Sequence, residues 1–267
     1  MQKEDLTFFR KWFLDYVNNF TSPDPLVREN IELKNEHTKR VCENILLLAK
    51  AEKLGKKESL LAETIALFHD LGRFEQFLKY KTFKDSESEN HAALGVKILK
   101  KAGILSRLPP GESDIILKAV EYHNLIEIPE TASNSPELLF YSKLVRDADK
   151  LDILRIICNN YKEGEECQNP ALELYLPDTP ECSKAVIEDI MNNRMAKMKE
   201  VCNRNDVKLL RLSWVFDINF PETFALLKEK RYLEIIISSL PETEEIRKVR
   251  KHIETYLEKQ LMQKQPC

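Results

Sequence analysis

Apolar side chains recur every three to four residues along most of the chain, a spacing that places them on one face of successive α-helices. The first such stretch ends before Pro23 and Pro25, since proline opposes continuation of a helix. Only 6 of the 267 residues are glycine, which disfavours a turn-rich sheet protein. The first stretch carries Leu6, Phe9, Phe13, Tyr16, Val17 and Phe20. The sequence therefore predicts an all-α fold, and we expect residues 1–267 to form a single helical unit.

Charge and cysteine content narrow the class of protein further. The 41 basic and 44 acidic residues give a formal net charge of −3, so the surface as a whole is not built for nucleic acid. The first twenty residues mix charges into their apolar positions, unlike a signal peptide, and no apolar run is long enough to span a bilayer. Without a CxxC pair, reduced thiols are expected at Cys42, Cys158, Cys167, Cys182, Cys202 and Cys267. We expect a cytoplasmic protein with no stable nucleic-acid or membrane partner.

Four of the five histidines lie on an apolar helical face or at the end of a predicted helix. These are His37, His69, His91 and His123, whereas His252 lies in a charged helical stretch near the C-terminus. A single histidine in a core is often only a hydrogen-bonded polar group. Four such histidines in one chain favour a shared functional site. His252 is not assigned to that site.

Acidic residues accompany these histidines inside an apolar segment. The helix that Ser135-Pro136 opens is apolar on much of its circumference, yet it carries Asp147, Asp149 and Asp152. Removing a carboxylate from water costs several kcal/mol, so a buried aspartate normally needs a cation or several hydrogen-bond donors. Imidazoles together with carboxylates suit divalent iron, manganese, zinc, cobalt or magnesium. A site for one or two such ions is predicted.

The segment LFHDLGR at Leu67–Arg73, preceded by His37 and followed by RDADKLD at Arg146–Asp152, resembles the HD-domain metal-dependent phosphohydrolases. The similarity covers about residues 32–157. It implies a multi-helix bundle with its HD-domain core at residues 26–160. Helical patterns continue around residues 184–201, 209–216, 224–240 and 244–261, within a predicted C-terminal helical extension at 161–267.

Carried over position by position, the resemblance implies that His37, His69, Asp70 and Asp149 bind the first metal ion. The last ligand of the family follows an alanine, which selects Asp149 rather than Asp147. Helical periodicity by itself does not separate these two aspartates.

A second metal ion is also implied. In two-metal members of the superfamily, two further histidines lie between the HD pair and the last aspartate, and the aspartate of HD bridges the two ions. His91 and His123 stand at those places, so we expect a dinuclear site bridged by Asp70. The alternative is a mononuclear enzyme in which the two histidines donate hydrogen bonds to the substrate phosphate.

Asp70, the shared ligand, is also a candidate catalytic residue. Positive side chains must neutralise the charge of the phosphoryl oxygens, and Arg73 and Lys150, which directly follow HDLG and Asp149, are the nearest candidates. The alternative for these two cations is ion pairing with Asp147 or Asp152.

The reaction implied is hydrolysis of a phosphate ester or anhydride by a metal-activated water. A small nucleotide-like substrate or another phosphorylated metabolite is expected, and no glycine-rich phosphate loop or dinucleotide fingerprint is present. The same ligands also serve di-iron oxygenases, and a regulatory module that binds metal and nucleotide is a further alternative. Residues after 161 could close the pocket or form a homodimer surface.

Overall fold

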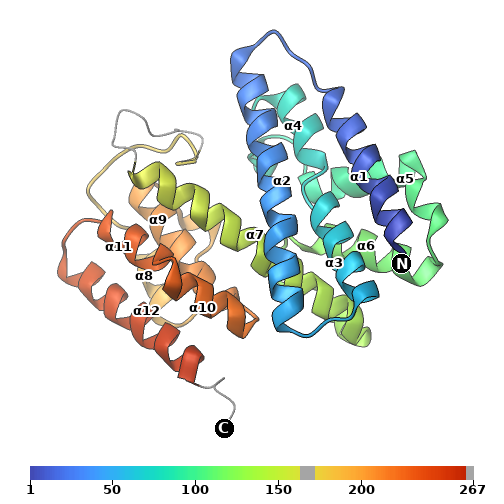
Figure 1. Ribbon diagram of the computed structural model, residues 1–267. Coiled ribbons are helices and arrows are strands. Elements are labelled where there is room, and N and C mark those ends of the chain that lie inside the picture. The colour runs from blue at the N-terminus through green and yellow to red at the C-terminus, as the bar shows by residue number, and fades with distance from the viewer. Residues whose placement is uncertain (163–171, 263–267) are drawn as a thin grey trace. The chain divides into compact units, whose positions relative to one another are not determined.

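The computed structural model describes residues 1–162 and 172–262. Every regular element in these ranges is a helix, so the predicted all-α class is confirmed. The chain divides into two compact units, Met1–Asp152 and Ile153–Cys267 (Figure 1). The expectation of one unit with a 26–160 core and a 161–267 extension stays a prediction.

The described cysteines are all reduced, and the described helices can be checked for membrane spans. Cys42, Cys158, Cys182 and Cys202 are free thiols, whereas Cys167 and Cys267 lie outside the described residues. Within the described ranges, no helix combines the length and the apolarity that crossing a membrane requires.

The first unit is a bundle of six helices and the first part of a seventh. They are α1 (Lys3–Asn18), α2 (Pro25–Ala51), α3 (Lys56–Phe68), α4 (Gly72–Tyr80), α5 (His91–Ala102), α6 (Pro110–Tyr122) and α7 (Pro136–Lys162). Short 3-10 turns lie in three connections: η1 (Asp85–Glu87), η2 (Ile104–Arg107) and η3 (Glu130–Asn134). α3 packs against α1, α2 and α6, while α5 packs against α4 and α6.

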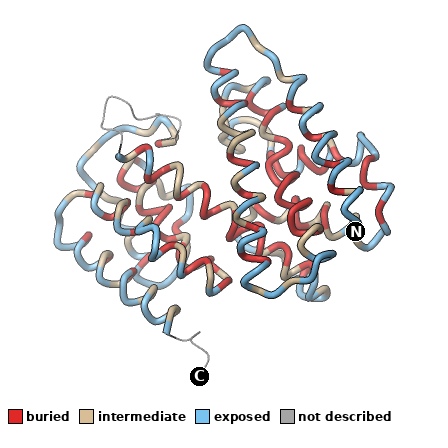
Figure 2. The backbone as a smooth tube through the Cα atoms, in the orientation of Figure 1, coloured by how far each residue is buried: buried red, intermediate tan, exposed pale blue. Residues whose placement is uncertain are grey.

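α3 is the buried centre of this bundle, and Figure 2 shows its second half as a continuous buried stretch. Every residue from Leu61 to Gly72 is buried, with Ile65 and Phe68 fully so. Burying a side chain of that size stabilises the fold by about 1.5–3 kcal/mol. Because the helix ends inside the bundle, the two residues that follow Phe68 are delivered to the interior.

The junction between α4 and α5 depends on a glycine. A Cβ atom at Gly72 would lie 2.1 Å from the carbonyl oxygen of His91 and 2.8 Å from the nitrogen of Gly95. No side chain fits that space, so only glycine allows the start of α4 to touch the first turn of α5. Asn90 caps α5 by accepting a hydrogen bond from the nitrogen of Ala93 at 2.9 Å. The contact fixes the position of His91, the first residue of α5.

In the part of the second unit that the structure describes, the end of α7 is followed by five further helices: α8 (Lys184–Met191), α9 (Arg204–Ser213), α10 (Pro221–Glu229), α11 (Tyr232–Ser238) and α12 (Glu244–Met262). Among residues 172–262, the 3-10 turns η5 (Met198–Glu200) and η6 (Trp214–Asp217) lie between these helices. α9 packs against α8 and α11, and α12 packs against α8 and α10.

Two of the expected helical stretches in this unit are interrupted. The pattern at 184–201 stops at Met191, because Asn193 adopts a left-handed conformation with φ 54°. The pattern at 224–240 is split into α10 and α11 by Arg231, with φ 57°. The apolar spacing in the sequence continues across both breaks, because the apolar residues before and after each break are buried in the same core. The spacing therefore did not reveal the breaks.

A buried carboxylate joins two segments of the second unit. Asp206 is fully buried in α9 and accepts hydrogen bonds from the nitrogen and hydroxyl of Ser183, at 2.7 and 2.6 Å. The nitrogen of Cys202 donates a third at 2.9 Å. The carboxylate therefore holds the residue before α8 against the first turn of α9.

Candidate metal centre

The structure brings all six predicted ligands together inside the first unit. Five helices supply them: His37 lies within α2, His69 caps the C-terminus of α3 and is followed by Asp70, His91 begins α5, His123 caps the C-terminus of α6, and Asp149 lies in α7. Their ligand atoms form three overlapping groups of three, each with its atoms within 4.8 Å of one another. Among the described residues, such groups involve these six side chains.

One oxygen of Asp70 faces the first half of the cluster. Its Oδ2 lies 3.4 Å from Nε2 of His37 and 3.7 Å from Nε2 of His69. Asp149 completes this half, with its Oδ1 at 3.1 Å from Nε2 of His37 and 3.6 Å from Nε2 of His69. Both carboxylates thus lie beside the same two imidazoles, and Asp149 also groups with His69 and His123.

The other oxygen of Asp70 faces the second half. Its Oδ1 lies 3.3 Å from Nε2 of His91 and 3.7 Å from Nε2 of His123. The rings of these two histidines are centred 5.0 Å apart. The carboxylate of Asp70 therefore lies between two ligand sets with one oxygen turned toward each.

All four imidazoles use Nδ1 for a partner outside the cluster. The partners are Asp152 for His37 (2.7 Å), the carbonyl oxygen of Ala66 for His69 (2.7 Å), Asp85 for His91 (2.8 Å) and the carbonyl oxygen of Val120 for His123 (2.6 Å). Carbonyl and carboxylate oxygens only accept, so each ring carries its hydrogen on Nδ1. In a neutral ring, Nε2 is then left with a lone pair.

Those lone pairs face each other in two close contacts. Nε2 of His37 lies 3.3 Å from Nε2 of His69, and Nε2 of His91 lies 3.1 Å from Nε2 of His123. Two acceptors at that distance repel unless a cation lies between them. Oδ1 of Asp149 is likewise buried without a hydrogen-bond donor. The donor set fits a divalent cation in each half, as in histidine- and carboxylate-bound metal sites.

Electrostatics keep the two carboxylates ionised. Burial opposes ionisation of Asp70, but Lys34 and His69 outweigh it and hold the pKa well below its usual range. The pKa of Asp149 is also well below normal, because His37 and His69 outweigh the effect of burial.

The pKa values of His69 and His91, one from each half, are shifted in opposite directions. Burial alone would lower the pKa of His69, yet Asp70 and Asp149 raise it. Burial, reinforced by Arg73, lowers the pKa of His91 to about 3. A proton is thus disfavoured between His91 and His123, which leaves a metal ion as the better partner for that pair.

Sequence reasoning missed three residues that surround the cluster. Asp85 in η1 accepts from His91, and Lys34 in α2 donates to Oδ2 of Asp70 at 2.7 Å. Arg40 donates to Oδ1 of Asp152 at 2.7 Å and so supports the carboxylate behind His37. Lys34 and Arg40 were detectable, since they lie one turn on either side of His37 on its helix, whereas Asp85 lies in a polar stretch without periodicity.

Arg73 is held by several acceptors at once. Its NH1 donates to Oε1 of Gln76 at 2.8 Å, to the carbonyl oxygen of Phe83 at 2.6 Å and to Oδ1 of Asp85 at 3.0 Å. Its Nε lies 3.5 Å from Oδ1 of Asp70. The ion pairs of Arg73 therefore involve Asp70 and Asp85 rather than the aspartates of α7.

The remaining predicted residues lie on α7. Lys150 and Asp147 are buried there, and Asp152 is bound by His37 and Arg40. Arg146, also buried, anchors the loop after α6 by donating to the carbonyl oxygens of His123 (3.2 Å), Leu125 and Ile126 (3.2 Å).

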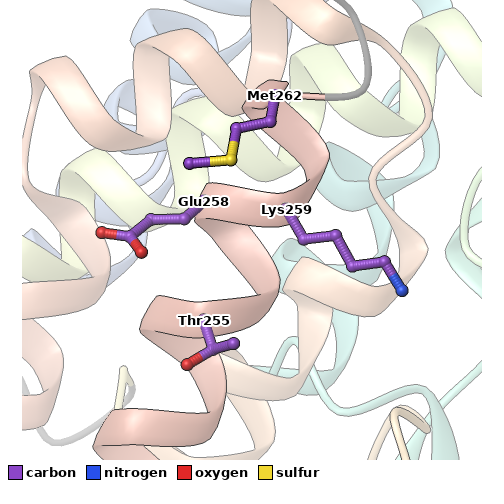
Figure 3. Close-up of a pocket in the computed structure, with 4 residues that line it drawn as sticks. All are labelled: Thr255, Glu258, Lys259 and Met262. Carbon is purple, nitrogen blue, oxygen red and sulfur yellow. The ribbon is translucent and has the colours of Figure 1, made fainter.

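The second unit offers a weaker candidate. Figure 3 shows a pocket on α12 lined by Thr255, Glu258, Lys259 and Met262. All four residues are exposed and come from one helix. His252, which the sequence left aside, lies on the same helix with its Nε2 3.0 Å from Oδ1 of Asn193. This pocket gathers no buried polar group, so the chemistry is assigned to the first unit.

Comparison with known proteins gives one family match. The family model for the HD domain matches residues 35–154, a range that includes all six clustered side chains. No curated protein and no solved structure matches the chain significantly. Residues 35–154 thus match the HD domain, and this match is consistent with the HD-domain superfamily of metal-dependent phosphohydrolases.

Proposed function

We propose that this protein is a metal-dependent hydrolase that cleaves a phosphate ester or anhydride of a small, nucleotide-like or otherwise phosphorylated metabolite. The observation that carries the proposal is the placement of Asp70 between two pairs of facing imidazoles, His37 with His69 and His91 with His123. Such a cluster suits two divalent ions that share one carboxylate.

Divalent ions bound there would supply Lewis acidity for the phosphoryl oxygens and would lower the pKa of water from about 15.7 toward 7. Asp70 keeps one oxygen for each half, and Asp149 completes the half that contains His37. Asp152 and Asp85 orient His37 and His91 through Nδ1, which directs both Nε2 atoms inward. These groups fix the ligand geometry before substrate arrives.

Charge supports an anionic substrate. Asp152 is balanced by Arg40 and Asp85 by Arg73, so Asp70 and Asp149 are the acids left to face the ions. Two divalent cations exceed the charge of two carboxylates, and an anion is needed to neutralise the remainder. We propose that Arg73 and Lys150 border this anion, Arg73 from beside Asp70. A phosphoryl group meets this requirement.

The experiment begins with protein purified without chelator and analysed for bound metals. Phosphate release is then measured on a panel of phosphomonoesters, nucleotides and dinucleotide polyphosphates with manganese, iron or magnesium added. His69→Ala and Asp70→Ala are expected to lose metal and turnover while retaining most helical content by circular dichroism.

Oxygen uptake by the iron-loaded protein separates the oxygenase alternative from hydrolysis. Oxygen consumption without phosphate release would contradict the proposal. Metal and nucleotide binding with no hydrolysis across the panel would instead support the regulatory module.

A further inference from the structure

Lys34 differs from the other cation that contacts Asp70. It is mostly buried, with 15% of its side chain exposed, and among the described residues its ammonium has one hydrogen-bond acceptor, Oδ2 of Asp70 at 2.7 Å. An ammonium carries three donors, so two of them are unused. Arg73 satisfies three acceptors through NH1 alone. Lys34 therefore has unused donor capacity at the centre, and so does Arg73, whose buried Nε lacks a hydrogen-bond partner.

The ammonium lies on the side of Asp70 where the first ligand set converges. Oδ2, which accepts from Lys34, is the same oxygen that faces Nε2 of His37 and His69. Lys34 and His37 are three residues apart on α2, so their side chains share a face of the helix. A divalent ion among these ligands would repel the ammonium and withdraw charge from its acceptor. The ammonium then needs a second anion nearby.

An aromatic ring limits where the ammonium can turn. Nζ of Lys34 lies 5.3 Å from the centre of the Phe83 ring, and that ring packs against the Phe77 ring at a tilt of 37° with centres 4.5 Å apart. Phe77 is buried, so the pair forms a fixed apolar wall. The ring covers one side of the ammonium beside the metal centre and contributes a cation–π attraction.

We propose that Lys34 binds a non-bridging oxygen of the substrate's phosphoryl group, and that the substrate presents this group as a dianion, as in a phosphate monoester or a terminal phosphate. The inference rests on the proposed function and deepens it. An ammonium and a surplus of metal charge together favour a doubly charged phosphoryl group over the singly charged group of a diester.

The test uses the full chain loaded with manganese and inorganic phosphate as the probe. Lys34→Met removes the charge and keeps much of the side-chain length. Lys39→Met is the matched control, because Lys39 lies on the same helix with half of its side chain exposed and pairs only with Glu36 there. Metal content by elemental analysis and phosphate affinity by calorimetry are measured for both variants and the parent chain.

We expect Lys34→Met to keep the manganese stoichiometry of the parent chain and to bind phosphate about 10- to 100-fold more weakly, the usual loss for a hydrogen bond to a charged group. Lys34→Arg should recover part of that affinity, and Lys39→Met should match the parent chain. Phosphate affinity unchanged in Lys34→Met would overturn the assignment. Loss of manganese in that variant would also overturn it, since Lys34 would then serve the metal site.

Hydrolysis is scored separately, so that the two proposals can fail independently. If the manganese-loaded parent protein binds phosphate through Lys34 but cleaves no phosphate ester, the proposed function is wrong and the role of Lys34 is retained. A parent protein that hydrolyses monoesters with the same kcat and KM as Lys34→Met would retain the function and remove the role of Lys34. Faster cleavage of diesters than of monoesters would refute the claim that the substrate presents a dianionic phosphoryl group.

Discussion

Replacing Asp85 with asparagine should weaken metal binding in one half of the centre and spare the other. The carboxylate of Asp85 accepts from Nδ1 of His91 at 2.8 Å and also binds Arg73, Gln76 and Asn124. Asparagine has almost the same shape and can still accept one hydrogen bond. It removes the negative charge that makes the imidazole a stronger ligand.

The expected size follows from the position of Asp85. Loss of a carboxylate that orients a metal-binding histidine typically lowers metal affinity 10- to 100-fold. A tenfold change equals about 1.4 kcal/mol, so the loss is about 1.4–2.7 kcal/mol for the ion held by His91 and His123. The half that contains His37 has its own carboxylate, Asp152, and should keep its affinity.

The assay is a manganese titration of metal-free protein, followed by elemental analysis after dialysis against a fixed manganese concentration. Glu87→Gln is the matched control, because Glu87 lies in the same turn, is 58% exposed and pairs with Lys84 rather than with a histidine. Asp85→Asn should bind the ion held by His91 and His123 less tightly, and Glu87→Gln should titrate like the parent chain. Equal weakening of both ions, or none, would refute the reasoning.

Three further predictions concern the scaffold. Gly72→Ala should force α4 away from the first turn of α5, destabilise the first unit by about 1–3 kcal/mol in urea unfolding and weaken the ion beside His91; an unchanged midpoint would contradict the close contact. Asp206→Ala leaves the donors of Ser183 and Cys202 without their shared acceptor, so we expect a loss of about 1–3 kcal/mol in the second unit, and metal content that changes with it would be inconsistent with a purely structural role. Removing metal with a chelator should lower the melting temperature, because the ion binds only the folded state, and adding the metal back should restore it. A melting temperature that does not change with metal would argue against the metal centre.

Local patterns in the sequence predicted much of this centre. His69 and His123 end apolar helices, and helix ends are readable from periodicity, so their placement in the interior followed directly. His37 could be placed on an inward face for the same reason. The identity of the ligands came from the resemblance to the HD family, because periodicity along α7 does not distinguish Asp147 from Asp149. The structure brings Oδ1 of Asp149 to 3.1 Å from His37.

The partners behind the ligands could not be predicted in this way. Asp152 meets His37 across 115 positions of sequence, and the carboxylate of Asp85 reaches His91 from an irregular turn. Both contacts depend on how helices pack rather than on any repeat in the chain. Gly72 illustrates the same limit, because nothing in its neighbours signals that another backbone lies 2.1 Å from its missing Cβ.

The most direct test of the account is the number of divalent ions that each chain holds after purification without chelator, compared with an Asp70→Ala variant of verified helical content. The facing imidazoles and the shared carboxylate predict about two ions per chain in the parent protein and almost none in the variant. Parent protein that folds normally and carries no stoichiometric metal under any loading condition would contradict the claim that a cation separates these histidines.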